Sequence, residues 1–247
     1  MHATVYAVAA SHPVRTALLM LEYKGIEAKR RDLPNVVDRP LLRAMGFPGP
    51  TVPAVKIDGR KIQTTRALSL ALDEIKPEPP LFPADPDRRV AVEAAEKWGD
   101  EVLQPIPRRL SWAALKRDRS GLLSFMEGPI MGIPPKVAAA TAGPLVAGSA
   151  RINKATDENV RADLMSLSGI LDQVDDLIAN GVIGGEQPNA ADFQIATSVR
   201  LLLCFDDLHP ILDGRPAADL AMRFVPHYPG HVPPVFPAEW LPAPSAA

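Results

Sequence analysis

The fold is decided by one stretch of sequence, Thr51-Val52-Pro53-Ala54-Val55-Lys56-Ile57-Asp58-Gly59-Arg60-Lys61-Ile62-Gln63-Thr64-Thr65-Arg66. Its apolar run is followed by Asp58-Gly59, a strong two-residue turn signal, and then by a second short apolar strand, which together predict a β-hairpin. Thr64 and Thr65 supply hydroxyls that can cap a helix starting near Arg66. We therefore expect a hairpin that runs directly into a helix.

The start of this hairpin has an open edge. Pro53 has no backbone N–H, so it cannot donate to a neighbouring strand there. The start of the following helix has free amides, which suit an anion. An open strand edge beside an anion-binding helix start is suited to a small peptide-like acid.

This arrangement resembles the glutathione S-transferase superfamily, whose N-terminal half is a thioredoxin-like domain. In that family a Val-cis-Pro pair aligns the cysteinyl backbone of glutathione, which implies this role for Val52 and Pro53. The family holds the γ-glutamyl carboxylate with an acidic residue or Gln followed by Ser. The resemblance gives this role to Thr64, Thr65 and Arg66, with Thr65 in place of the Ser. Thr64 at the Glu/Gln position departs from the family pattern.

Whole-chain properties exclude several classes of protein. The chain has 247 residues, enough for one large or two ordinary domains. Its formal net charge of −2 gives no electrostatic argument for nucleic acid or for an anionic membrane. Cys204, the single cysteine, excludes an intrachain disulfide framework, and the histidine spacing predicts no metal site. With no visible secretory signal or membrane-spanning run, we expect a reduced, cytoplasmic protein.

The first part of the chain reads as a small α/β unit. Residues 4–8 have strand composition, and Pro13 fits the first turn of a helix that ends at Lys24-Gly25. Residues 27–33 form a second predicted strand, with at most one short helix near 41–44 before the hairpin. This β-α-β, then β-β-α order predicts a thioredoxin-like domain over residues 1–76.

The remainder of the chain has a helical pattern. A proline-rich linker is predicted at 77–86, followed by an all-α domain over 87–247, so the fold class is α+β. Helices are expected at 87–103, 157–179 and 188–205, the last of them buried at the centre. The segment 128–150 fits a mobile helix pair, a lid or an ordered surface connection equally well. Trp240 is expected to pin a proline-rich tail whose final residues are disordered.

A second resemblance lies at the start of the last predicted helix. In Pro188-Asn189-Ala190-Ala191-Asp192-Phe193, Asn189 can cap the helix while Asp192 reaches back to the N–H of the cap. The glutathione S-transferase superfamily carries an Asp at this position of its core helix, within a similar capping box. The two motifs lie far apart in the sequence, so the resemblance covers nearly the whole chain.

The candidate catalytic residue is Ser11. In the family a hydroxyl or thiol after the first strand hydrogen-bonds the glutathione sulfur, and a hydroxyl lowers the thiol pKa by stabilising the thiolate. Ser11 is followed by His12 and Pro13, with Arg15 nearby, which is similar to the serine-type classes. The alternative is that Ser11 only caps the helix, with His12 exposed. Tyr6 is a weaker candidate hydroxyl.

Cysteine chemistry is not expected. There is no cysteine at positions 11–14, which argues against the members that form mixed disulfides with glutathione. Cys204 lies inside an apolar run and is expected to be an inert buried thiol.

A second-substrate pocket is implied by the resemblance. The region of Trp98, Arg108, Arg109 and Trp112 borders the electrophile pocket in the family, and His12 lies beside the candidate hydroxyl. Arginines and indoles can hold an aromatic or carboxylated co-substrate. The alternative is that the tryptophans belong to the core and the arginines to surface ion pairs.

The resemblance implies an enzyme that conjugates glutathione, or a related low-molecular-weight thiol, to a small-molecule electrophile, or a thiol-dependent isomerase. It also implies a homodimer and a role in detoxification, while the charge and the histidine spacing predict no nucleic-acid partner and no metal. A non-catalytic glutathione-transferase-fold module for ligand binding or protein interaction is the alternative. A different thiol without a γ-glutamyl group is a third hypothesis, in which Thr64 is no defect.

Overall fold

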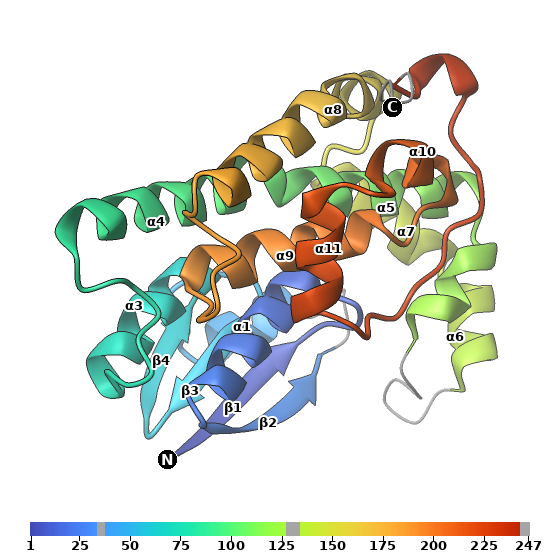
Figure 1. Ribbon diagram of the computed structural model, residues 1–247. Coiled ribbons are helices and arrows are strands. Elements are labelled where there is room, and N and C mark those ends of the chain that lie inside the picture. The colour runs from blue at the N-terminus through green and yellow to red at the C-terminus, as the bar shows by residue number, and fades with distance from the viewer. Residues whose placement is uncertain (34–37, 127–133, 243–247) are drawn as a thin grey trace.

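The computed structural model describes residues 1–33, 38–126 and 134–242. Its N-terminal domain contains a four-stranded sheet in the order β2-β1-β3-β4 (Figure 1). The strands are β1 (His2–Ala7), β2 (Glu27–Asp32), β3 (Ala54–Ile57) and β4 (Arg60–Gln63). Strand β1 pairs parallel with β2 and antiparallel with β3, and β3 pairs antiparallel with β4. The predicted thioredoxin-like arrangement is confirmed.

The two faces of the sheet contact different helices. Ala3, Val5 and Ala7 of β1 are buried in the main core together with residues of α1 (His12–Tyr23) and α3 (Thr65–Ile75). Side chains alternate along a strand, so Tyr6 points to the opposite face, which is covered by α2 (Asp38–Ala44). There its ring meets Phe47 edge-on, with 5.6 Å between the ring centroids. Tyr6 is therefore a packing residue.

The hairpin and the helix after it form as predicted. Asp58 and Gly59 have φ angles of 45° and 95°, the left-handed pair that a tight hairpin turn requires. The hydroxyl of Thr64 accepts a hydrogen bond from the backbone N–H of Ala67 at 3.2 Å and so caps α3. Both local signals in the sequence are confirmed.

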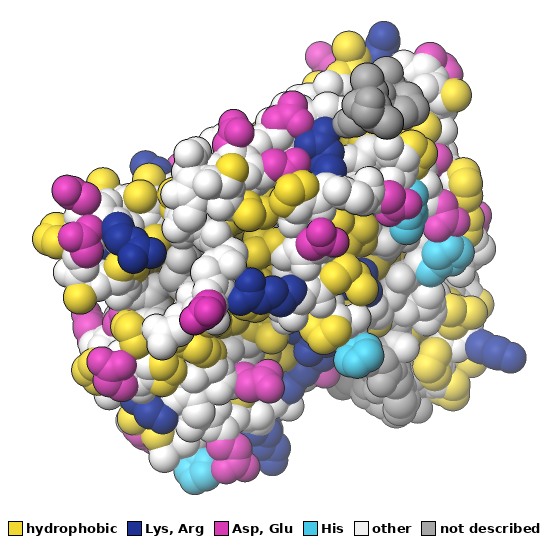
Figure 2. All heavy atoms as spheres, in the orientation of Figure 1, with side chains coloured by type: hydrophobic (Ala, Val, Ile, Leu, Met, Phe, Trp, Pro, Cys, Tyr) yellow, Lys and Arg dark blue, Asp and Glu magenta, His cyan; other side chains and the backbone are white. Residues whose placement is uncertain are grey.

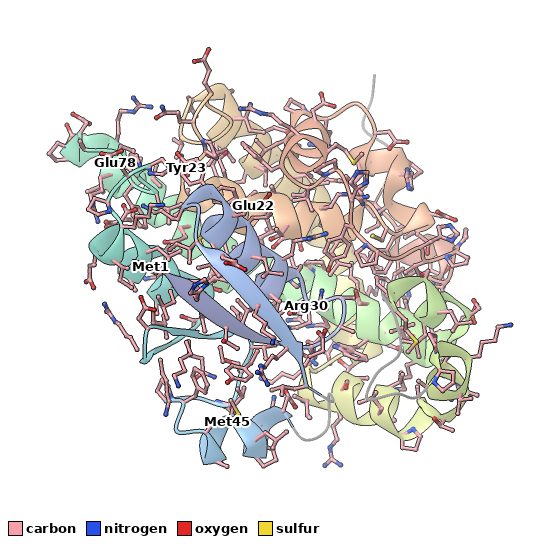
Figure 3. The ribbon with its side chains drawn as sticks, turned by 90° about the horizontal axis from the view of Figure 1, so that it is seen from below. Met1, Glu22, Tyr23, Arg30, Met45 and Glu78 are labelled. Carbon is pink, nitrogen blue, oxygen red and sulfur yellow. The ribbon has the colours of Figure 1, made fainter. Side chains whose placement is uncertain are left out.

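The connector between the domains is tied to the first domain by a buried lysine. Lys24, at the end of α1, is fully buried, and its Nζ donates to Asp73 Oδ1 at 2.5 Å and to the Lys76 carbonyl at 2.8 Å. Asp73 in turn accepts from the backbone N–H of Leu81. Tyr23, next to Lys24, lies beside the connector residue Glu78 in Figure 3. The end of α3 at Ile75 and the start of the next helix at Pro86 are thus joined by an anchored segment.

The helical domain begins with a helix that changes its winding. Helix α4 (Pro86–Trp98) continues through a π-helical turn (Gly99–Leu103) into α5 (Pro105–Arg117), whereas the sequence predicted a single helix over 87–103. A Cβ at Gly99 would lie 3.0 Å from the Ile195 side chain, so glycine permits this close approach. Helix α5 was not predicted from the sequence. It starts at Pro105, in the first helical turn, where proline is tolerated.

The other helices surround one buried helix. Helix α8 (Asp157–Ala179) has the predicted bounds, and every residue of α9 (Ala190–Leu202) is buried except Arg200. The buried position predicted for α9 is confirmed. The remaining helical segments are Ser120–Phe125, α6 (Pro135–Thr141), α7 (Gly143–Ile152), Asp206–Leu208, α10 (His209–Leu212), α11 (Pro216–Phe224) and Ala238–Trp240.

The segment 128–150 is partly described. From residue 134 onward it forms α6 and most of α7, a helix pair, which was one of the open alternatives. Residues 128–133 of that prediction lie outside the described residues.

The capping box at the start of α9 is present. Asn189 Oδ1 accepts from the backbone N–H groups of Ala191 and Asp192, and Asp192 Oδ2 accepts from the N–H of Asn189 at 2.8 Å. Asp192 Oδ1 also accepts from the N–H of Gly184. Burial raises the pKa of Asp192 to about 6, and these hydrogen bonds limit the rise. The predicted structural role of Asp192 is confirmed.

The proline-rich tail crosses both domains (Figure 1). The Tyr228 hydroxyl donates to the carbonyl of Ala10 at 2.6 Å, which links the tail to the loop after β1. Farther along, the Trp240 ring lies 5.1 Å from the guanidinium of Arg117 and packs against the core. The prediction that Trp240 pins the tail is confirmed, and the predicted disorder of the last residues falls on 243–247, outside the described residues.

The surface adds little information about partners. In the view of Figure 2, acidic and basic side chains are interspersed, in keeping with the net charge of −2. Among the described helices, none has both the length and the apolar character needed to cross a membrane.

Candidate active site

A cleft of about 270 Å³ lies between the two domains. The first domain contributes the loop after β1, the start of α2 and the segment before β3. The second contributes one side of α5, the turn after it, and parts of α6 and α7. Of the predicted site residues, the structure brings four together here: Ser11, His12, Val52 and Trp112.

Ser11 stands at the start of α1 with its hydroxyl uncommitted. The chain turns at Ala10, where φ is 53°, and Ser11 is then extended with φ −75° and ψ 113° as the N-cap residue. Its side chain makes no cap hydrogen bond. The structure therefore does not contain the alternative arrangement, in which the Ser11 hydroxyl caps α1. The positive end of α1 lies beside it. This geometry suits an anionic atom next to Ser11.

His12 is buried rather than exposed. Only 2% of its surface is accessible, and its Nε2 lies 3.2 Å from the carbonyl oxygen of Gln104 in the helical domain. Burial, with a smaller effect from the nearby Arg108 guanidinium, lowers the pKa of His12 to about 3. The imidazole is therefore neutral at pH 7 and donates from Nε2, joining the two domains without adding charge to the cleft.

Val52 presents an unpaired backbone edge. Neither its N–H nor its C=O is hydrogen-bonded within the described part of the chain, and the Val52–Pro53 peptide is cis. The Gln63 side chain fixes the preceding segment, accepting from the Gly49 N–H and donating to the carbonyls of Gly49 and Thr51. Gln63 was not predicted as a positioning residue. Its place at the end of β4, opposite the start of β3, is the signal that could have revealed it.

The start of α3 adjoins this edge but does not line the cleft. The Thr64 N–H donates to the Pro53 carbonyl at 3.3 Å, and Thr64 has a φ of 75°. The next residue, Thr65, is 1% exposed, and its hydroxyl has no hydrogen-bond partner among the described residues. A buried hydroxyl without a partner is unfavourable, so Thr65 has unused hydrogen-bonding capacity at the start of α3.

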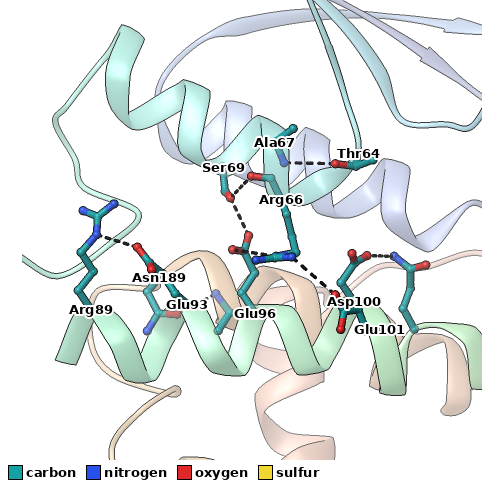
Figure 4. Close-up of polar contacts among 12 residues, drawn as sticks. Thr64, Arg66, Ala67, Ser69, Arg89, Glu93, Glu96, Asp100, Glu101 and Asn189 are labelled. Atoms are coloured by element: carbon teal, nitrogen blue, oxygen red, sulfur yellow. Dashed lines mark hydrogen bonds and ion pairs between the residues drawn. The ribbon is translucent and has the colours of Figure 1, made fainter. Parts of the chain in front are cut away.

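Arg66 belongs to a cluster with acidic residues of the helical domain (Figure 4). Its Nε lies 4.0 Å from Glu96 Oε2, and its Nη1 lies 3.8 Å from Glu101 Oε1. The Ser69 hydroxyl donates to Glu96 Oε1 at 2.7 Å. Burial raises the pKa of Glu96 to about 7, and the Ser69 hydrogen bond and the Arg66 charge only partly oppose this. Arg66 is therefore committed to the domain interface rather than to the cleft.

We expect Glu96→Gln to remove part of the pH dependence of stability. Between pH 4.5 and about 7 the folded protein keeps a proton on Glu96 that the unfolded chain releases, so this residue's stabilising contribution falls as pH rises. At pH 8 the variant should exceed the wild type by up to about 3 kcal/mol in unfolding free energy, and the difference should vanish near pH 4. Urea unfolding across this range measures it.

Glu101→Gln is the matched control, because the Glu101 side chain is 55% exposed and also pairs with Arg66. It should change the unfolding free energy by less than about 1 kcal/mol at every pH. Parallel pH profiles for wild type and Glu96→Gln would show that Glu96 titrates normally.

Two predicted pocket residues lie outside the cleft. Arg109 binds Asp163 of α8 through Nη1, at 2.6 and 2.7 Å, and Trp98 is half-buried against the main core. Successive residues on a helix point about 100° apart, so Arg109 turns away while its neighbour Arg108 lines the cleft. The predictions for Trp98 and Arg109 as pocket residues are corrected here. Without α5 in the predicted helices, the face of each arginine could not be assigned from the sequence.

Other chemistry is not supported near the cleft. Cys204 is 3% exposed, and burial raises the pKa of its thiol to about 11, so it is an unreactive thiol as predicted. Among the described residues, no group of three or more His, Cys, Asp or Glu side chains is placed to bind a metal ion.

Comparison with known proteins agrees with this arrangement. Residues 5–80 match the family described as "Glutathione S-transferase, N-terminal domain". No curated protein sequence matches the chain. A glutathione S-transferase structure from Sinorhizobium meliloti 1021 aligns with a TM-score of 0.63 at 17% sequence identity, covering 92% of this chain and 91% of that chain.

Two further solved structures are similar. The β-etherase LigF from Sphingobium sp. strain SYK-6 aligns with a TM-score of 0.59 at 15% identity, covering 90% of this chain and 99% of its own. A glutathione S-transferase from Methylobacterium radiotolerans, in complex with glutathione sulfonate, gives a TM-score of 0.52 at 16% identity, with 90% of each chain covered.

A thioredoxin-like domain followed by an all-helical domain, with a cleft between them, defines a glutathione-transferase-like fold. Residues 5–80 match the glutathione S-transferase N-terminal domain family, and the chain as a whole shares the glutathione S-transferase fold.

Proposed function

We propose that this protein conjugates glutathione, or a related low-molecular-weight thiol, to a small electrophile, or uses the thiol to catalyse an isomerisation. One observation carries the proposal: an uncommitted hydroxyl, on Ser11, and an unpaired backbone edge, at Val52, line the same cleft. Together they fit a cysteinyl group, whose backbone would pair with Val52 while its sulfur meets Ser11.

Ser11 would act by stabilising the thiolate. Its O–H donates a hydrogen bond to the sulfur, which favours the charged form and lowers the thiol pKa. The positive end of α1 acts in the same direction. His12 stays neutral and adds no charge. The thiolate then attacks the electrophilic carbon and a C–S bond forms. In a substitution the bond to the leaving group breaks and its electron pair leaves with that group; in an addition the C=C π bond breaks and the neighbouring carbon takes a proton from water.

The carboxylate end of the thiol would bind at the start of α3. The unpartnered hydroxyl of Thr65 and the free first amides of this helix supply donors for a carboxylate. Pro53 and Thr64 connect this point to the Val52 edge through one backbone hydrogen bond. Arg66 would add positive charge without direct contact, because its guanidinium already faces Glu96 and Glu101.

The second substrate would occupy the space between the domains, with His12 and Trp112 on its walls. Solved structures with this fold include a β-etherase and a transferase in complex with glutathione sulfonate, and the second of these supports a glutathione-type ligand in the cleft. A cytoplasmic homodimer, acting in detoxification, completes the proposal.

A second candidate function is a non-catalytic module with the same fold. It is favoured by Thr64, whose hydroxyl oxygen accepts from the Ala67 N–H and caps α3 at the position where the family pattern has Glu or Gln. The same observation also suits a thiol that lacks a γ-glutamyl group.

Thermal unfolding with added thiols separates these hypotheses. Ligand that binds only the folded state raises the melting temperature, and a ligand at 100 times its dissociation constant adds about 2.7 kcal/mol. We expect millimolar glutathione to raise the melting temperature by a few degrees, and S-methylglutathione serves as a probe without a free thiol. If a different cellular thiol alone is effective, the cofactor changes and the fold does not. If no thiol shifts the transition, the conjugation proposal fails and the non-catalytic module takes its place.

A further inference from the structure

One arginine of the cleft, Arg108, has no acidic partner among the residues that the structure describes. Helix α5 presents Arg108, Ser111, Trp112 and Leu115 to the cleft, the i, i+3, i+4, i+7 spacing of one helix face. Arg108 is half-buried, and among the described residues it forms no ion pair. Its guanidinium donates from Nη1 to Gln104 Oε1 at 3.1 Å, and this oxygen belongs to a neutral amide.

The ionisable residues near Arg108 are either neutral or already have partners. Arg109, beside it in the sequence, is neutralised by Asp163. His12 faces it as a neutral imidazole. Asp100 is the acidic residue whose charge acts on Arg108. Its carboxylate accepts from Gln104 Nε2 at 3.0 Å, so the Gln104 amide lies between the carboxylate and the guanidinium. Within the described part of the chain, Arg108 is therefore a cation without a direct acidic partner, in a mainly apolar cleft.

Two more charged residues line the cleft, on the other wall. Asp38 and Arg39 lie at the start of α2, in the first domain, and Arg39 is exposed. An exposed arginine is screened by water, whereas a half-buried one gains more from an anion. Of the two cleft arginines, Arg108 is thus the one whose environment most favours an anionic ligand.

We propose that the cleft selects electrophiles that carry a carboxylate on a flat apolar body, with the carboxylate on Arg108 and the body against Trp112. A guanidinium binds a carboxylate through two parallel N–H groups. Arg108 and Trp112 are four residues apart on α5, so a carboxylate on Arg108 would lie one helical turn from the indole. The inference rests on the proposed function for its reacting step, because the thiol would bind on the opposite wall at Ser11 and Val52.

An aryl chloride that carries a carboxylate, such as 4-chloro-3,5-dinitrobenzoate, would react by substitution of its chlorine. The thiolate sulfur forms a C–S bond to the ring carbon that carries chlorine. The C–Cl bond then breaks, chloride leaves with the bonding electron pair, and the thiol proton has gone to solvent. Arg108 takes no part in these bonds. It holds the carboxylate at the far end of the ring.

The test compares an acid and a neutral amide of the same shape. Isothermal titration calorimetry with 3,5-dinitrobenzoate and 3,5-dinitrobenzamide measures binding without reaction. Wild-type protein should bind the acid roughly tenfold or more tightly than the amide, the usual size of a hydrogen bond to a charged group. In Arg108→Gln the ratio should fall to about one, and Arg108→Lys should keep part of it. The amide affinity checks that each variant is folded.

Arg39→Gln is the matched control, since it removes the other cleft arginine and should leave the ratio as in wild type. A ratio that survives Arg108→Gln, or that falls only in Arg39→Gln, overturns the inference. A loss of the glutathione-induced thermal shift in Arg108→Gln would assign this arginine to the thiol and also overturn it.

Turnover of 4-chloro-3,5-dinitrobenzoate and its amide with glutathione then separates the two proposals. Acid selectivity in binding with no turnover of either compound contradicts the proposed function and leaves the anion site standing. Turnover of both compounds at equal kcat/KM supports the function and contradicts the selectivity.

Discussion

Ser11→Ala is expected to lower kcat/KM for glutathione conjugation by roughly 10- to 100-fold at pH 7. One hydrogen bond to a charged group contributes about 1.5–3 kcal/mol. Losing this bond should therefore raise the pKa of the bound thiol by about 1 to 2. The Ser11 hydroxyl makes no cap bond to α1, so its removal should leave the unfolding free energy almost unchanged. The loss should shrink as pH rises and the thiolate forms without help.

The pKa of bound glutathione, measured from thiolate absorbance, checks this result directly. Ser111→Ala is the matched control: it removes another hydroxyl of the cleft, one that already donates to the Pro107 carbonyl. Its bound thiol should keep the wild-type pKa. Equal thiol pKa values in wild type and Ser11→Ala would assign the activation to the α1 terminus alone and remove Ser11 from the mechanism.

Lys24→Met is expected to cost about 3–5 kcal/mol of unfolding free energy, the largest stability effect that we predict. The ammonium group is completely buried and donates to Asp73, while Asp73 also orients the connector through Leu81. Removing one member of a buried ion pair leaves the other charge without its partner in a poorly solvated place. Chemical denaturation at pH 7 measures the loss.

Arg60→Met is the control for this effect. Arg60 pairs with Glu74 on the same helix as Asp73, but the two side chains are 53% and 64% exposed. An exposed pair contributes at most about 1 kcal/mol. Losses of similar size in the two variants would sink the argument from burial.

Local signals explain what could be predicted from the sequence. The Asp58-Gly59 turn, the Thr64 cap and the capping box of Asn189 and Asp192 all act over a few residues, so their geometry follows from residue type alone. These signals allowed us to predict the order of the strands and helices, and with it the thioredoxin-like domain.

Features set by long-range packing were not accessible. Val90 fits the helical apolar series of α4, yet it is 66% exposed, because the inward face is fixed by where α9 lies. The π-helical turn depends on the close approach of Ile195 to Gly99. The same turn determines which arginine of α5 enters the cleft. Periodicity in one segment carries no information about such contacts.

The bond from Tyr228 to Ala10 joins residues 218 positions apart in the chain. Arg15, one turn into α1, likewise donates to the carbonyl of His227. At a synthesis rate of about 5–20 residues per second, the loop that carries Ser11 leaves the ribosome roughly 10–40 seconds before its support from the tail. The sheet and α1 can assemble early, but the loop acquires its complete set of contacts only after residue 228 has been synthesised. Premature termination just before the tail would therefore release chains with both domains and an unsupported Ser11 loop.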